Sequence, residues 1–432
     1  MKRRLLPILM TLVLVCALPI WAAFVTSGDV TNPLVCTAGA TSSEESAVDK
    51  LKLAISRGVD AQLTEDIEIT QTLYVERSMT IDLNGHVLKM TGNSSVLRVK
   101  KDGPHPATLT ITDSRPQNPH GSYAGLPAGG VITGGKGPYV TGIYYVGGAV
   151  FLEKDTTLKL EGGTLTGNSG SSIYIGGATL VMSGGTITGE TVGVYNNVGT
   201  FTMTGGRITG CSDRGVYVYN GNMTMSGTAY IGENPNARRE DIYVYESDHK
   251  HTDLSVTGGT IAGNVRIVFL ESLRPTQDEL KAAANSVVKE QGVFDGHIKV
   301  EKGTSGTCVD YNSVNFIDEV AKTRTLKLVL QPNAVEEPET PATVNGREFM
   351  YWAKEGASEA WDFNTVIEVP LTLYAVRTPA SSSGGYYYYP TTDTKADDTK
   401  GSPKTADPGV ALYAALSLLS LTGLTCTARK KF

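Results

Sequence analysis

Charge and cysteine are both scarce in this chain of 432 residues. Charged residues make up only 19% of it and the formal net charge is −6, with no basic stripe, which argues against nucleic acid as a partner. The five cysteines lie far apart: Cys16 and Cys426 fall in apolar runs near the ends, and the odd set Cys36, Cys211 and Cys308 remains for the body. That spacing predicts neither a disulfide framework nor a CxxC metal site.

Long apolar runs are confined to the two ends of the chain. Near the start, basic residues 2–4 precede an apolar run over residues 5–21, and two alanines follow. This order predicts a secretory signal peptide over residues 1–23. We therefore expect residues 24–44 to form an N-terminal linker.

The second apolar run covers residues 410–428. At about 1.5 Å per helical residue it can cross a hydrocarbon layer of about 30 Å, so the sequence predicts a transmembrane helix over residues 409–428. The basic tail over residues 429–432 is expected to stay in the cytoplasm. This orientation places the body outside the cell and makes the membrane one of its partners.

A short motif precedes this helix: Ser402-Pro403-Lys404-Thr405-Ala406. It resembles the sorting signal of Gram-positive sortase substrates, with Ser402 in place of the usual leucine and Ala406 in place of the usual glycine. The resemblance implies sortase and peptidoglycan as partners and cleavage after Thr405; the alternative is a plain membrane anchor. Residues 379–408 are rich in Ser, Gly, Pro, Thr, Lys and Asp, which predicts a disordered wall-spanning linker.

A six-residue phrase recurs through the body: two glycines, a variable residue, an aliphatic residue, a small polar or apolar residue and a glycine. It occupies residues 129–134, 162–167, 184–189, 205–210 and 258–263, with a degraded copy from residue 226. The second glycines of successive copies, at 163, 185, 206 and 227, are 22, 21 and 21 residues apart. Flanking steps of 33 and 32 residues fit one inserted loop each.

Each period contains three short alternating segments. In one period these are Leu158 with Leu160, then Leu165, then Ile173 with Ile175. Because side chains alternate along a strand, these aliphatic residues all point inward. Glycine pairs allow the sharp turns between strands, and stacked coils pair in parallel.

The sequence therefore predicts an all-β fold, a right-handed parallel β-helix of about 21–22 residues per coil over residues 45–270. The repeat, over residues 60–270, resembles the pectin-lyase-like β-helix superfamily, a resemblance that implies the fold and says little about activity. Ser46 as N-cap and Gly58 as a stop predict a helix that covers the open N-terminal end.

Residues 271–324 are expected to form a connecting helix, over 276–289, and strands. Residues 325–378 then resemble the Listeria–Bacteroides repeat, a small β-rich module. The resemblance rests on Phe349-Met350-Tyr351-Trp352, on Trp361-Asp362-Phe363-Asn364-Thr365 and on Leu371-Thr372-Leu373-Tyr374-Ala375. The family's final tryptophan is missing. The resemblance implies a spacer or interaction role; the alternative is an unrelated small β domain.

Aromatic residues occupy the outward positions of the third segment of each period. They are Phe151, Tyr174, Tyr195, Tyr217 and Tyr243, with Tyr219 and Tyr245 one pleat further along. Steps of 23, 21, 22 and 26 residues keep the first five in register. The pattern predicts an exposed aromatic ladder that binds sugar faces. Alternatively, the rings only stabilise neighbouring strands or pack under a loop.

Catalytic and metal sites find little support in the sequence. The carboxylates near the third segment, including Asp213 and Glu240, fall at different offsets, so no cluster is predicted. Asp213 with Arg214 is a weak catalytic candidate, and an ion pair between Arg214 and Glu240 is the simpler expectation. Residues 248–251 contain two histidines, and we interpret this segment as a solvated loop rather than a metal site. No metal or other cofactor is predicted.

These observations predict a surface-anchored adhesin or glycan-binding protein of a Gram-positive bacterium. Its partner would be an extracellular polysaccharide or a host matrix glycan. One alternative is a polysaccharide lyase or glycoside hydrolase on the same scaffold, and another is a purely structural stalk.

Overall fold

The computed structural model describes residues 34–36, 46–139, 145–235, 240–247, 254–273, 275–287, 293–303 and 308–380. The predicted signal peptide, sorting motif and transmembrane helix lie outside them, as does the wall-spanning linker apart from residues 379–380. None of the helices in the described ranges combines the length and the hydropathy that a membrane span requires.

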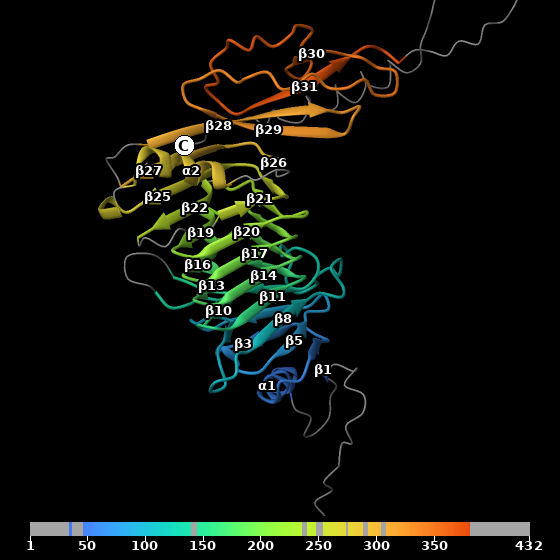
Figure 1. The fold of residues 1–432 in the computed structure, drawn as a ribbon. Helices are drawn as coiled ribbons and strands as arrows, with labels where there is room; N and C mark the ends of the chain where they lie inside the picture. Colours follow the sequence, from blue (N-terminus) through green and yellow to red (C-terminus); the bar gives the residue numbers. More distant parts are fainter. Residues whose placement is uncertain are drawn as a thin grey trace, which may run out of the picture. The chain divides into compact units, whose positions relative to one another are not determined.

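The body is a right-handed parallel β-helix, in which the strands of successive coils stack into three sheets (Figure 1). The first sheet contains β1 (Leu34–Cys36), β2 (Ala61–Leu63), β5 (Met79–Asp82), β8 (Thr108–Thr112), β11 (Thr157–Leu160), β14 (Thr179–Met182), β17 (Thr200–Met203), β20 (Asn222–Met225) and β23 (Leu254–Val256). The second contains β3 (Ile67–Ile69), β6 (Val87–Met90), β9 (Val131–Thr133), β12 (Thr164–Thr166), β15 (Thr186–Thr188), β18 (Arg207–Thr209), β21 (Tyr230–Gly232), β24 (Thr260–Ile261) and β26 (Val293–Phe294).

The third sheet is the longest. It contains β4 (Leu73–Val75), β7 (Leu97–Val99), β10 (Val150–Leu152), β13 (Ser171–Gly176), β16 (Val192–Asn197), β19 (Arg214–Tyr219), β22 (Glu240–Glu246), β25 (Asn264–Phe269), β27 (His297–Lys302), β28 (Cys308–Asp318), β31 (Leu371–Arg377) and β30 (Phe349–Ala353), and β29 (Thr323–Leu330) pairs with β28. Each coil passes through the three sheets in turn, and parallel crossovers of this kind are right-handed.

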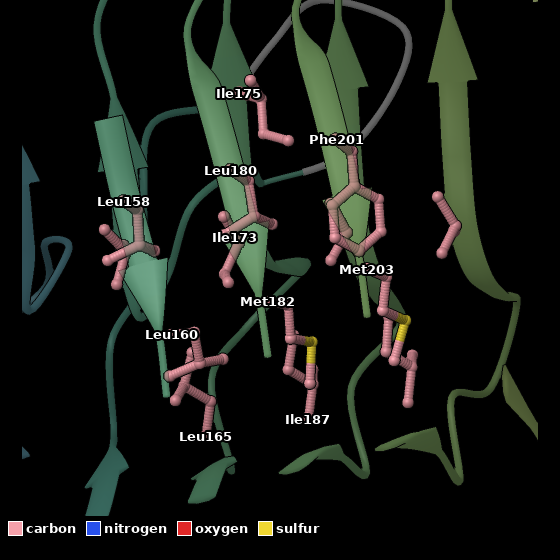
Figure 2. Packing of buried hydrophobic residues seen from close by; sticks show 14 of the residues in the cluster. Leu158, Leu160, Leu165, Ile173, Ile175, Leu180, Met182, Ile187, Phe201 and Met203 are labelled. Carbon is pink, nitrogen blue, oxygen red and sulfur yellow. The ribbon is translucent and has the colours of Figure 1, made fainter. Parts of the chain in front are cut away.

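The strands stack in the register that the repeat predicts. Leu158 pairs with Leu180 and Leu180 with Phe201 in the first sheet, and Leu165 pairs with Ile187 in the second. All of these side chains are fully buried and fill the interior between the sheets (Figure 2). The predicted period is therefore confirmed.

The two glycines of each phrase have different roles. Gly185 has φ +73°, a left-handed conformation that a side chain disfavours. Gly184 lies so close to the coil below that a Cβ there would sit 2.1 Å from the carbonyl oxygen of Glu161. One glycine thus permits the turn, and the other permits the close stacking of coils.

A helix covers the first coils, as predicted. In α1 (Ala47–Arg57), the Ser46 hydroxyl accepts from the Asp49 amide at 3.2 Å, and Gly58 ends the helix in the left-handed conformation. Leu51 and Ala54 are fully buried against the β-helix core. β1 falls within residues 24–44, which the sequence predicts to be a linker. The strand was not predicted because three residues are too few to show an alternating pattern.

Parallel stacking continues beyond the predicted end at residue 270. β26 pairs in parallel with β24, and β27 with β25. The short helices η1 (Glu271–Leu273) and α2 (Gln277–Val287) are inserted into this last coil. Leu280 and Val287 of α2 are buried, and the helix packs against β23, β27 and β28.

Antiparallel strands follow, and β28 belongs to two structures at once. Its first half pairs with β27 of the β-helix, and its second half pairs with β29 and β31. We call β28–β31 and their connections the C-terminal module, residues 308–378. Its small core centres on Phe316 and Trp352, whose rings lie 5.1 Å apart. Since β28 is shared, the module is joined to the β-helix by strand pairing as well as by the chain.

Candidate functional site on the third sheet

An aromatic row follows the outer face of the third sheet. Phe151, Tyr174, Tyr195, Tyr217 and Tyr243 pair in register from β10 to β22. We call these five residues the tyrosine ladder. Successive ring centroids lie 4.7, 5.5, 4.8 and 5.1 Å apart. Parallel pairing of equivalent positions is what brings the rings together.

The ladder is less exposed than the sequence predicts. Tyr195 is only 3% exposed, and the other four rings are half-buried. Val146 and Val192 are fully buried against Tyr195 and its neighbours. Tyr195 and Tyr217 are stacked, whereas Tyr217 and Tyr243 meet edge to face, so neighbouring rings cover part of one another. The expectation of an exposed ladder is therefore corrected to a half-buried one with a buried ring, Tyr195, at its centre.

A second, shorter row lies one pleat along. Tyr219 and Tyr245 are paired in register and stacked, with centroids 5.6 Å apart and planes at 9°. The Ser247 hydroxyl donates to the Tyr219 hydroxyl at 3.1 Å, and the Asn197 amide donates to the Tyr174 hydroxyl at 2.7 Å. This part of the face therefore presents polar groups at the edges of aromatic rings.

Arginine side chains terminate the ladder at both ends. The Arg98 guanidinium lies 4.5 Å from the centroid of the Phe151 ring. At the other end, Arg214 and Arg266 lie 4.2 and 5.6 Å from the Tyr243 ring. A cation over an aromatic face is attracted to its negative quadrupole, which holds the terminal rings in place.

The C-terminal end of the ladder carries alternating charges. Six side chains, the ionic chain, follow one another in contact: Asp213, Arg214, Glu240, Arg266, Glu301 and Lys299. The predicted pair of Arg214 with Glu240 is present, with Nε and Oε2 3.5 Å apart. Asp213, the weak catalytic candidate, pairs with Arg214 at 2.5 Å. Both candidates are thus members of an ion-pair network.

The second half of the chain is tighter. Nη1 of Arg266 donates to Glu240 at 3.1 Å, and its Nε donates to Glu301 at 2.8 Å. Nζ of Lys299 lies 3.0 Å from the other oxygen of Glu301. Each of these cations therefore already has a carboxylate partner.

A pocket of about 420 Å³ opens beside these residues. It is lined by Glu240, Asn264, Val265, Arg266, His297 and Lys299. Arg266 pairs in register with Tyr243, and Lys299 with Arg266, so the pocket continues the line of the ladder. The His297 amide donates to the Asn264 side-chain oxygen at 3.2 Å, which joins the last two coils at the pocket's edge.

Protonation states in the pocket follow from burial and pairing. Burial lowers the pKa of His297, so its imidazole is neutral at pH 7. The hydrogen bond to Glu301 raises the pKa of Lys299. Burial acts to raise the pKa of Glu301, but the hydrogen bonds from Arg266 and Lys299 outweigh it and the pKa is lowered. The pocket thus combines a neutral imidazole with compensated charges.

Sequence reasoning missed His297, Lys299 and Glu301, because the repeat was expected to stop at residue 270. It also missed Arg266, which lies before that end but takes the place of the tyrosines on the preceding coils. The alternation in Asn264–Phe269 and His297–Lys302 is the signal that could have found them. Among the residues that the structure describes, no cluster of three or more His, Cys, Asp or Glu side chains could hold a metal. Residues 248–251, with both histidines of the predicted solvated loop, lie outside that part.

Comparison with protein-family models, with curated proteins and with solved structures finds no match to this chain.

Proposed function

We propose that this chain is a cell-surface glycan-binding protein, an adhesin of a Gram-positive bacterium, whose ligand lies along the outer face of the third sheet. The observation that carries the proposal is the continuity of the tyrosine ladder with the pocket at its end. The ligand would be an extracellular polysaccharide or a host matrix glycan.

The chemistry of the face suits a polyhydroxylated chain. The half-buried tyrosines offer apolar ring surface beside hydroxyl groups, and carbohydrate combines C–H groups with hydroxyls that donate and accept. The pocket adds donors and acceptors from Arg266 and His297 within a volume typical of small-ligand sites. A repeated face of this kind matches a repeated ligand better than a single small molecule.

The binding test is a glycan array probed with the protein and a triple variant, Tyr174→Phe with Tyr217→Phe and Tyr243→Phe. Phenylalanine keeps the ring packing and removes the hydroxyl groups. We expect at least a tenfold loss of glycan binding. Tyr230→Phe, on the second sheet, is the matched control and should bind normally. Equal binding by both variants would contradict a ligand site on the ladder.

A purely structural ladder is the second candidate, favoured by the 3% exposure of Tyr195. It predicts that the triple variant and the control bind alike, while Tyr195→Ser lowers the melting temperature. The enzyme alternative predicts shortened products when the protein is incubated with polysaccharide. The same purified protein and variants can therefore be used to test both alternatives.

We propose that residues 1–23 direct export, that the scaffold belongs to the pectin-lyase-like superfamily, and that residues 325–378 form a Listeria–Bacteroides repeat.

We further propose that sortase joins Thr405 to peptidoglycan. Cell-wall hydrolase should release the protein from a Gram-positive host. A Thr405→Ala variant should instead stay with the membrane, and identical behaviour of the two would favour the plain membrane anchor.

A further inference from the structure

Resting on the proposed function, we infer that the pocket beside Tyr243 takes an uncharged sugar unit and discriminates against uronic and other acidic sugars. The ligand class is a neutral hexose or pentose residue of the bound glycan. The inference is supported by the charge balance of the ionic chain and by the donors and acceptors in the pocket that its ion pairs do not use.

Charge balance is the first argument. The ionic chain contains three cations and three carboxylates, and the two cations that line the pocket both contact Glu301. An anionic sugar would have to compete with Glu301 for them and approach Glu240, which also lines the pocket. Because like charges in a partly buried site repel strongly, such a ligand is disfavoured.

The remaining hydrogen-bonding capacity is the second argument. Arg266 donates three of its five N–H groups to Glu240 and Glu301, which leaves two. Lys299 contacts one carboxylate with an ammonium that has three donors. The ring of neutral His297 supplies one donor and one acceptor. This mixture suits neighbouring hydroxyl groups, each of which donates and accepts.

Position is the third argument. Arg266 and Lys299 follow Tyr243 on successive strands, so a glycan that lies along the ladder reaches the pocket without a change of direction. The Arg266 guanidinium, which lines the pocket, lies 5.6 Å from the half-buried Tyr243 ring at the end of the ladder. The pocket would therefore define the specificity of an otherwise extended surface.

The test compares the full-length protein's affinity for a neutral hexose oligosaccharide and for the same backbone oxidised to uronate at C6, by calorimetry. We expect the neutral ligand to bind at least tenfold more tightly. Lys299→Met, which keeps the stem and removes the donors, should lose at least fivefold in neutral-sugar affinity. Lys159→Met, an exposed lysine on the first sheet, is the matched control and should be unchanged.

Glu301→Gln provides the reciprocal test. It removes the carboxylate that occupies Arg266 and Lys299, so uronate affinity should rise at least tenfold while the melting curve confirms a folded protein. Tighter uronate binding by the unaltered protein, or an unchanged ratio in Glu301→Gln, overturns the inference while the proposed function stands. Failure of the unaltered protein to bind any glycan overturns both.

Discussion

The β-helix and the C-terminal module bury their apolar side chains in different ways. In the β-helix, equivalent residues of successive coils stack into one continuous core that extends from α1 to β28. The module has a separate small core around Phe316 and Trp352. Stability in the first case is spread over many similar layers, whereas in the second it depends on a few contacts.

Buried charge separates the two regions further. The module buries a carboxylate with its counter-ion: the side chains of Asp318 and Arg377 are each 1% exposed, and their charged atoms lie 2.5 Å apart. The hydrogen bond from Arg377 lowers the pKa of Asp318. In the β-helix, Glu190 is 1% exposed, and its side chain accepts hydrogen bonds from uncharged donors, the backbone and side-chain amides of Asn168. Burial raises the pKa of Glu190 to about 8.

A row of polar side chains accounts for the position of Glu190. At the bend before the third sheet, the side chain of one coil accepts from the backbone amide of the coil before it. Asn168 accepts from Gly135 at 3.0 Å, Glu190 from Asn168 at 3.0 Å, and Asn234 from Cys211 at 2.8 Å. Glu190 thus occupies a place where other coils use asparagine.

The largest expected effect is loss of the module's ion pair. Asp318→Ala leaves Arg377 charged and buried, which should lower the free energy of unfolding by about 3–5 kcal/mol. Of the residues from 46 to 380, only Trp352 and Trp361 are tryptophans, so fluorescence during urea unfolding monitors the module. Exposed Glu337→Ala is the control. An unchanged transition would show that the module does not depend on this pair.

Glu190→Gln is expected to make the β-helix less sensitive to pH. The folded-state pKa lies above the ordinary 4.5, so the stability contribution is complete below about pH 4.5 and is lost as pH rises to about 8. At about 1.4 kcal/mol per unit, the variant should be more stable by about 3 kcal/mol at pH 7. Thermal melts from pH 4 to pH 9 measure this, and parallel pH profiles for the two proteins would contradict it.

Gly206→Ala should break the stacking of coils locally. Gly206 has φ +80°, and an added Cβ would lie 2.5 Å from the carbonyl oxygen of Gly184. A left-handed alanine costs about 1–2 kcal/mol before any clash, so we expect a loss of at least about 2 kcal/mol. Hydrogen exchange should show faster exchange in neighbouring β15 and β18 with the module unaffected. Equal loss of protection in the module would mean that the two regions unfold together.

The smallest effect is expected at Val198, an exposed residue with φ +59° in the turn before β17. A β-branched residue is strained in this conformation, and the equivalent turns use Gly177 and Asn220. Val198→Asn should therefore raise the free energy of unfolding by about 1 kcal/mol. Val181→Asn, on a strand of the first sheet, is the control and should not be stabilising.

Most of the β-helix and part of the candidate site could be predicted from the sequence. The period, the inward aliphatic residues, the glycine turns and α1 follow from patterns within one coil, as does the register of the tyrosine ladder. The last coil was missed because η1 and α2 interrupt the repeat between β25 and β26. The pocket was missed with it, since its residues lie on both sides of that interruption.

What the sequence by itself determined is the local alternation and the spacing of glycines, because these repeat within 21–22 residues and specify one coil at a time. Only the tertiary structure decided that Val146 covers Tyr195, that β28 is shared between the β-helix and the module, and that Arg377 reaches Asp318. These features join residues far apart along the chain, where no periodic pattern links one to the other.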